Sequence, residues 1–128
     1  MVLIGLMLAI ALPRLRAFAD GMAVERAARE LAAAHRRARM AAVLQGRVLE
    51  LTVNANDLDV RPRGDSTRLW HADGPAAGGV TLAGPQRTLS FSPVGMSLGL
   101  SNATFLLTRG TATRSVVVSR LGRVRILP

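Results

Sequence analysis

The chain begins with an uninterrupted apolar run. Residues 1–12 read MVLIGLMLAIAL, without a charged or polar side chain, and Pro13, Arg14 and Arg16 follow. As an α-helix, a run of this length rises only about 18 Å, whereas the hydrocarbon core of a bilayer is about 30 Å thick. The pattern therefore predicts a membrane-seeking segment that cannot span a bilayer alone.

The surroundings of this run narrow its interpretation. A secretory signal peptide would carry a basic region before the apolar stretch and a small-residue cleavage site after it, and neither pattern is present. A buried core helix remains possible, because apolar runs of this length are often found in protein cores. A third interpretation is that the sequence as given begins inside a longer transmembrane helix.

A second helix-forming region covers residues 14–45. It is rich in alanine, contains no further proline, and is expected to end at Gly46. Apolar residues recur at steps of two to four and outline one stripe, which we expect to pack on the rest of the fold. The stripe comprises Phe18, Met22, Val24, Ala28, Leu31, His35, Ala38 and Ala42.

After Gly46 the hydrophobic period changes from helical spacing to alternation. In residues 48–53 apolar side chains alternate with polar ones, which predicts a half-buried strand, and residues 58–61 are expected to pair back across a turn. The loops are expected at residues 62–66, 72–79, 84–87 and 96–102. Further strands are predicted near residues 68–71, 80–83, 88–92, 104–108, 115–119 and 123–127. The fold class is therefore α+β, with a long helix packed on a small antiparallel sheet.

Few single residues offer chemistry. We expect His35, on the apolar stripe, to be a hydrogen-bonded histidine at the edge of the core, and Trp70 to anchor the core or rim of the sheet. Asp57 and Asp59 stand two apart near a strand start, a spacing shared by solvated turn carboxylates and weak cation sites. We interpret them as solvated carboxylates and predict no metal site.

Composition adds one further feature, a strong positive charge. The chain of 128 residues has a net charge of +9, and all 17 basic residues are arginine. Such a chain attracts polyanions such as nucleic acid or anionic lipid, although a GC-rich genome would produce the same arginine bias. Cysteine is absent, so stability must come from packing rather than from disulfides or cysteine-bound metal.

The sequence also lacks the short motifs of common enzymes. No nucleophile elbow, HExxH, P-loop or GxGxxG occurs. We therefore predict that the protein is not an enzyme and that it has no catalytic residues and no cofactor.

Four short motifs carry a resemblance to a known family. Residues 4–13, IGLMLAIALP, are similar to the end of the pilin-like transmembrane segment with its proline. Residues 39–46, RMAAVLQG, resemble a helix end that usually reads RseA…G, but have Met40 and Ala41 in place of the usual Ser-Glu pair. Residues 91–95, FSPVG, resemble an FsPdG element, and residues 116–125 resemble a closing hairpin that ends in GRxR. In this order they resemble the GspH/FimT family of minor pseudopilins and type IV pilin-like proteins.

The resemblance implies a pilin-like fold in two parts. Residues 1–13 would be a membrane-embedded helix segment, truncated at its N-terminus, and residues 14–128 a periplasmic GspH/FimT domain. The family's basic leader, cleavage-site glycine, methylated phenylalanine and early glutamate are missing here. We expect them upstream of Met1 in the same reading frame; the alternative is that the gene is a remnant whose product cannot be processed. The segment that would enter the membrane and the filament core comprises Val2, Leu3, Ile4, Gly5, Leu6, Leu8, Ile10, Leu12 and Pro13.

The function implied by the resemblance is that of a minor pseudopilin in type II secretion, placed at or near the pseudopilus tip. Its partners would be other pseudopilin or minor pilin subunits, the bacterial inner membrane and secreted protein cargo, with a single membrane pass and the head in the periplasm. The alternative is a FimT-like minor type IV pilin that binds DNA during natural transformation.

The candidate DNA site is the C-terminal tail. On a strand, Arg123 and Arg125 point to one face while Val124 and Ile126 point to the other, and Arg120 lies before the turn at Gly122. Arginine side chains suit phosphate oxygens, and such contacts carry affinity without sequence readout. With 17 arginines, however, such a pair also arises by chance, and few aromatic residues are available for base stacking.

Overall fold

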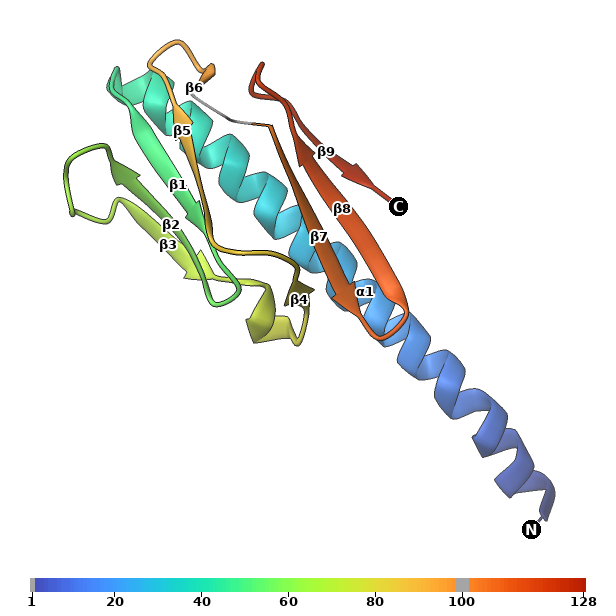
Figure 1. Cartoon of the computed structure of the whole chain (residues 1–128). Helices are drawn as coiled ribbons and strands as arrows, with labels where there is room; N and C mark the ends of the chain where they lie inside the picture. Colours follow the sequence, from blue (N-terminus) through green and yellow to red (C-terminus); the bar gives the residue numbers. More distant parts are fainter. Residues whose placement is uncertain (1, 99–101) are drawn as a thin grey trace.

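One helix dominates the computed structural model, which describes residues 2–98 and 102–128 (Figure 1). Helix α1, Val2–Gln45, continues through Pro13 without interruption. It ends at Gly46, which adopts the left-handed φ of +62°, and the Arg47 amide donates to the Ala42 carbonyl at 3.3 Å. This is the Schellman type of helix end, and the helix boundary expected at Gly46 is confirmed.

Among the described residues, nine strands and one short 3₁₀ helix follow the helix. The expected strands all exist, although β3 and β8 lie two and three residues from their predicted starts. Strand β6, Ser97–Leu98, and the 3₁₀ helix η1, Pro75–Gly78, fall in segments predicted as loops, and residues 99–101 of the predicted loop 96–102 lie outside the described residues. The remaining strands are β1 Leu49–Val53, β2 Asp57–Pro62, β3 Trp70–Asp73, β4 Thr81–Leu82, β5 Arg87–Phe91, β7 Ala103–Arg109, β8 Ala112–Val118 and β9 Val124–Leu127.

The strands form two antiparallel sheets rather than the single sheet expected from the sequence. The first has the order β3-β2-β1-β5-β6 and the second the order β4-β7-β8-β9. Strand β4 pairs with β7 although β5 follows it in the chain, so the chain crosses between the sheets at both ends of β4. Both sheets lie along the same helix, as Figure 1 shows. The α+β class and the helix-on-sheet layers are confirmed.

The hydrophobic core lies between α1 and the inner faces of both sheets. Strand β1 shows the alternation that the sequence predicts, with Leu49, Leu51 and Val53 fully buried. The helix contributes mainly alanines, whose small side chains let the sheets approach its backbone closely. The buried helix residues are Val24, Ala27, Ala28, Leu31, Ala32, Ala34, His35, Ala38 and Ala42.

The predicted apolar stripe is wrong at its N-terminal end. Phe18 is 68% exposed and Met22 is 52% exposed, whereas every stripe residue from Val24 onward is buried. The cause is the length of the sheets. The β7–β8 turn at Gly110 reaches the helix near Asp20, and residues 2–19 of the helix, before that point, are all exposed. The helical periodicity of the sequence does not show where along the helix the sheets end.

His35 is in the core, but it is not hydrogen-bonded as expected. Its side chain is 1% exposed, and neither ring nitrogen has a partner among the described residues. The ring meets Phe91 edge-on, with 4.9 Å between the centroids. Burial, followed by the charges of Arg39 and Arg36, lowers the pKa of His35 to about 4. The residue therefore packs as a neutral aromatic ring.

Trp70 anchors the rim of the first sheet, as predicted. It is half-buried and packs against the core cluster. The guanidinium of Arg37 lies 4.9 Å from the centre of its ring, so a cation–π contact links α1 to strand β3.

The buried His35 predicts an acid-sensitive head. Because its folded pKa lies below the usual value of 6.5, the unfolded chain binds the proton more readily between these values. The contribution of neutral His35 to stability should be complete above pH 6.5, fall as the pH drops toward 4 and change no further below it, with a total loss of about 3 kcal/mol. Urea unfolding of the wild type and of His35→Met across this range measures the effect.

The substitution His35→Met should remove most of the pH dependence in that window, because methionine has a similar volume and no proton to gain. His71→Gln is the matched control, since His71 lies at the surface beside Asp57. Equal slopes for the wild type and His35→Met would show that His35 does not control acid stability.

Candidate functional site

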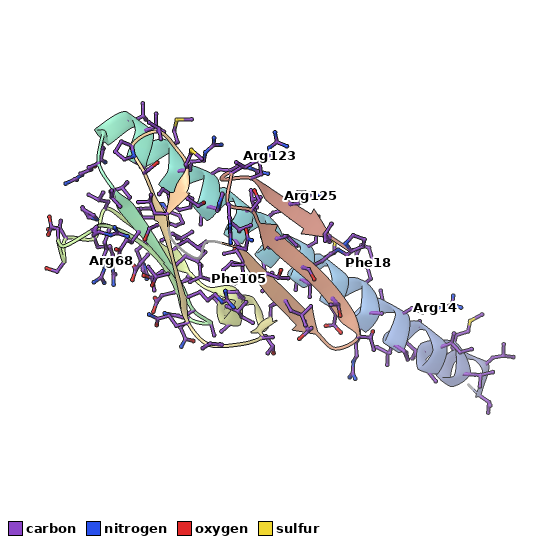
Figure 2. All side chains as sticks on the ribbon, turned by 45° about the horizontal axis from the view of Figure 1, so that its top comes forward. Arg14, Phe18, Arg68, Phe105, Arg123 and Arg125 are labelled. Carbon is purple, nitrogen blue, oxygen red and sulfur yellow. The ribbon has the colours of Figure 1, made fainter. Side chains whose placement is uncertain are left out.

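The N-terminal part of α1 projects from the head without covering partners. Residues 2–19 are exposed along their whole length, and residue 1 lies outside the described residues. Helix α1 contains a stretch long and apolar enough to cross a membrane, with a mean hydropathy of 1.8 and none of it buried. Figure 2 shows the labelled side chains of Arg14 and Phe18 on this projecting part.

Five of the eight carboxylates form ion pairs with an arginine or histidine side chain of the described residues. Glu25 binds Arg29 at 3.0 Å within the helix and Arg114 of β8 at 3.1 Å. Asp20 binds Arg109 at 3.1 Å and so ties the end of β7 to the helix. Each such pair contributes little to stability at an exposed site.

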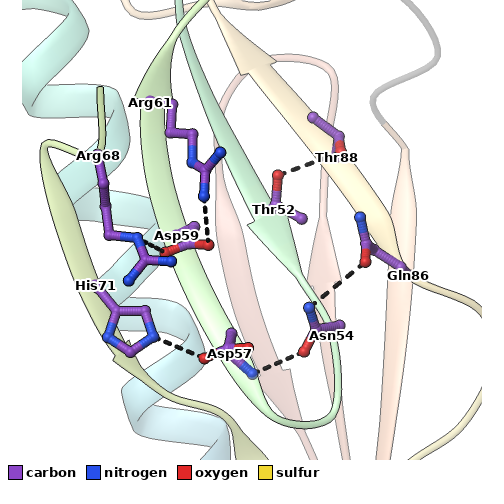
Figure 3. Close-up of polar contacts among 9 residues, drawn as sticks. All are labelled: Thr52, Asn54, Asp57, Asp59, Arg61, Arg68, His71, Gln86 and Thr88. Carbon is purple, nitrogen blue, oxygen red and sulfur yellow. Dashed lines mark hydrogen bonds and ion pairs between the residues drawn. The ribbon is translucent and has the colours of Figure 1, made fainter. Parts of the chain in front are cut away.

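Asp57 and Asp59 lie on the outer face of the first sheet and are held by side chains of β2, of β3 and of the segment just before β3 (Figure 3). Nε2 of His71 is 2.7 Å from Oδ1 of Asp57. Asp59 pairs with Arg68 at 2.9 Å and with Arg61 at 3.5 Å. Among the residues of the described ranges, no group of three or more His, Cys, Asp or Glu stands close enough to hold a metal ion.

The tail arginines occupy the positions that strand geometry predicts. Val124 and Ile126 of β9 pack against the core, while Arg123 and Arg125 are exposed (Figure 2). Arg120 lies in the β8–β9 turn and is also exposed. Strand β9 is an edge of the second sheet, and no ion pair within residues 2–98 and 102–128 involves these arginines.

Three of the motifs quoted above meet at the end of the head that lies farthest from the N-terminus. Nε of Arg39 donates to the carbonyl of Gly95 at 2.7 Å, which ties α1 to the β5–β6 turn. The β8–β9 turn packs on the same pair, because a Cβ at Gly122 would lie 2.8 Å from the Gly95 oxygen and 3.1 Å from Nε of Arg39. Arg39 therefore joins the helix to one turn from each sheet.

The two turns have the same construction. In each, a glycine with left-handed φ, Gly95 at +81° and Gly122 at +76°, donates to the carbonyl of the serine three residues earlier, at 2.9 and 3.1 Å. The serine hydroxyl accepts from the amide four residues later, Met96 at 3.2 Å for Ser92 and Arg123 at 3.3 Å for Ser119. Each turn follows the three-residue hairpin pattern closed by glycine.

The paired turns leave their third residues exposed in equivalent places. Val94 is 76% exposed and Leu121 is 61% exposed. We did not predict this pairing from the sequence, although a signal is present, since both turns read Ser-x-x-Gly. Their meeting at Arg39 is a tertiary feature that neither motif contains by itself.

Comparison with known proteins agrees with this architecture. Residues 27–122 match the model of the family described as Type II transport protein GspH, and the matched range ends just before Arg123. No curated protein matches the chain.

Solved structures resemble the fold. A crystal structure of the type IV minor pilin FimU of Pseudomonas aeruginosa strain PAO1, in space group P21, superposes with a TM-score of 0.68, at 23% identity over 82% of this chain and 88% of FimU. A second crystal form, P65, gives a TM-score of 0.65 at 22% identity over 81% and 92%. The pilin-like fold implied by the sequence motifs is confirmed.

Substitution of Gly122 tests the junction at Arg39. Gly122→Ala should cost about 1 kcal/mol for its left-handed backbone and a further 1 to 3 kcal/mol because the new Cβ meets the Gly95 carbonyl. Gly64→Ala is the matched control, since Gly64 has a φ of +80° with nothing within 4 Å. Chemical unfolding of both variants measures the difference, and equal losses would contradict the close approach at position 122.

Proposed function

We propose, because this chain belongs to the GspH family of type II transport proteins, that it is a minor pseudopilin subunit of a type II secretion system. The single observation that carries the proposal is the bare apolar end of α1 joined to a pilin-like head. In this role the helix holds the subunit in the membrane and later packs with the helices of other pseudopilin subunits at or near the pseudopilus tip.

The apolar side chains at the start of α1 suit both the membrane and a bundle of similar helices. Its segment from Val2 to Leu12 carries no charge, so moving it from lipid into a bundle of similar helices exposes no charged group to an apolar medium. Gly5, Ala9 and Ala11 are small, and small residues allow close helix approach in membranes. With residues 1–13 embedded in the bacterial inner membrane as part of a single-pass helix, the domain of residues 14–128 would occupy the periplasm, where it would meet secreted cargo.

This role requires no turnover chemistry. The family and the fold are those of structural pilin-like proteins. Assembly of the subunit rests on surfaces and helix packing rather than on a catalytic centre.

A charge placed in the helix tests membrane anchoring. Ile10→Arg should shift the chain from the membrane fraction to the soluble fraction, because it places a charge inside the short apolar segment, and an arginine within a membrane helix costs up to about 3 kcal/mol. Leu44→Arg is the matched control, since Leu44 is also exposed and lies at the other end of α1. Carbonate extraction followed by immunoblotting measures the distribution. Retention of Ile10→Arg at the wild-type level would contradict the anchor.

A second candidate function is DNA binding by a FimT-like minor pilin. The observation that favours it is the exposed set Arg120, Arg123 and Arg125, which has no acidic partner among the described residues. No aromatic residue follows Phe105, so this surface would bind phosphate rather than stack on bases.

DNA binding through this tail predicts a specific salt dependence. In mild detergent, replacing Arg123 and Arg125 by alanine should weaken duplex binding about equally for all sequences and lower the log–log salt slope by roughly 2. Arg61→Ala with Arg63→Ala is the control, because it removes the same charge from arginines that already pair with Asp59 and Glu50. Mobility shifts at several salt concentrations measure both. Identical retardation of the wild type and the tail variant would remove the tail as a DNA site.

A further inference from the structure

Six exposed apolar side chains gather around the junction at Arg39. They come from the last turns of α1, from the β5–β6 turn and its following residue, and from the β8–β9 turn. Their exposure ranges from 44% to 78%. We call this surface the distal cap, and it comprises Met40, Val43, Leu44, Val94, Met96 and Leu121.

The three parts of the cap are in contact. A Cβ at Gly95 would lie 3.2 Å from Cγ2 of Val43, so the β5–β6 turn rests directly on the helix end. Gly122 of the β8–β9 turn packs against the carbonyl of Gly95. In Figure 1 both turns and the C-terminal end of α1 lie at the end of the head that is opposite the N-terminus. The three segments that carry the cap residues are therefore neighbours at one end of the head.

The cap is also held in place before any partner arrives. Val94 and Leu121 sit on turns closed by the same set of backbone and serine hydrogen bonds, and Arg39 fixes the turns to the helix. A surface ordered in this way loses little conformational entropy on binding. Exposed apolar side chains that are both clustered and ordered are typical of interaction sites rather than of scattered surface residues.

The charges around the distal cap indicate which kind of partner it would bind. Residues 31–49 and 74–128, which supply the whole cap, contain no Asp or Glu. They do contain Arg39, Arg120 and Arg123 at or beside the junction. The cap is therefore an apolar centre with cationic side chains around it and no acidic side chain from its own segments.

We infer that the distal cap docks another protein whose contact surface has an apolar centre and carboxylates at its edge. A second copy of this chain does not fit, because it would bring the same arginines face to face. The membrane that holds α1 does not fit either, because Leu12 and Met40 are separated by about 40 Å of helix. A nucleic acid would use the arginines but would leave the apolar centre without a counterpart.

The inference goes beyond the proposed role, since it concerns the head alone and would hold for any acidic protein partner. It rests on the proposed function only for its choice of probes, which are the purified acidic pilin-like subunits of the same host. Those subunits are titrated against the full chain in mild detergent, with calorimetry as the readout.

One acidic subunit should bind, and Val94→Asp and Leu121→Asp should each weaken that binding at least tenfold. Both positions are exposed turn residues that accept aspartate, and an unchanged thermal unfolding curve verifies the fold. Leu106→Asp is the matched control, because Leu106 is a partly exposed leucine on β7 outside the cap, and it should bind like the wild type. Affinity should also fall with added salt because the rim is cationic.

Four outcomes would overturn the inference. Two concern the protein partner: no acidic subunit binds, or the cap variants bind it as well as the control does. The other two would identify a different occupant: the cap variants abolish self-association of the chain, or they abolish binding of duplex DNA and no protein binds. None of these outcomes bears on membrane anchoring. The proposed role is tested separately, by the fractionation of Ile10→Arg.

Discussion

The packing of one alanine-rich helix face against two sheets is the contact on which the rest of the head depends. Among the described residues the two sheets share no hydrogen-bonded ladder, since β6 ends one sheet and β4 and β9 end the other. What keeps them together is the helix behind them and the side chains between. The small residues Ala28, Ala34 and Ala38 bring both sheets close to the helix backbone, where larger side chains from the strands fill the space.

The junction at Arg39 completes this arrangement at the distal end. There the last turns of the helix meet the turns that connect β5 to β6 and β8 to β9. The guanidinium of Arg39 donates to the Gly95 carbonyl, and Gly122, which has no side chain, packs closely against both groups. Because the same residues hold the turns and surround the exposed apolar cap, the shape of the candidate docking surface depends directly on the fold.

Local patterns predicted local structure well and tertiary relations poorly. The alternation in residues 48–53 and 123–127 placed β1 and the outward arginines of β9 correctly, because side-chain direction in a strand is a geometric property of the chain. The split into two sheets was not predictable in this way, since β4 pairs with a strand far along the chain. Phe18 was placed in the core because helical periodicity does not show where a sheet ends. The matched Ser-x-x-Gly turns were visible in the sequence, but their meeting at Arg39 was not.

The direction of α1 has a mechanical consequence. The strands run roughly along the helix, as Figure 1 shows, so a pull on the N-terminal end of α1 loads the interface between helix and sheets in shear. Under such a load the contacts between residues 24 and 42 must slide together, whereas peeling would break them one at a time. The head is therefore built to resist force along the axis of its helix, which is the direction in which a subunit anchored by that helix would be pulled.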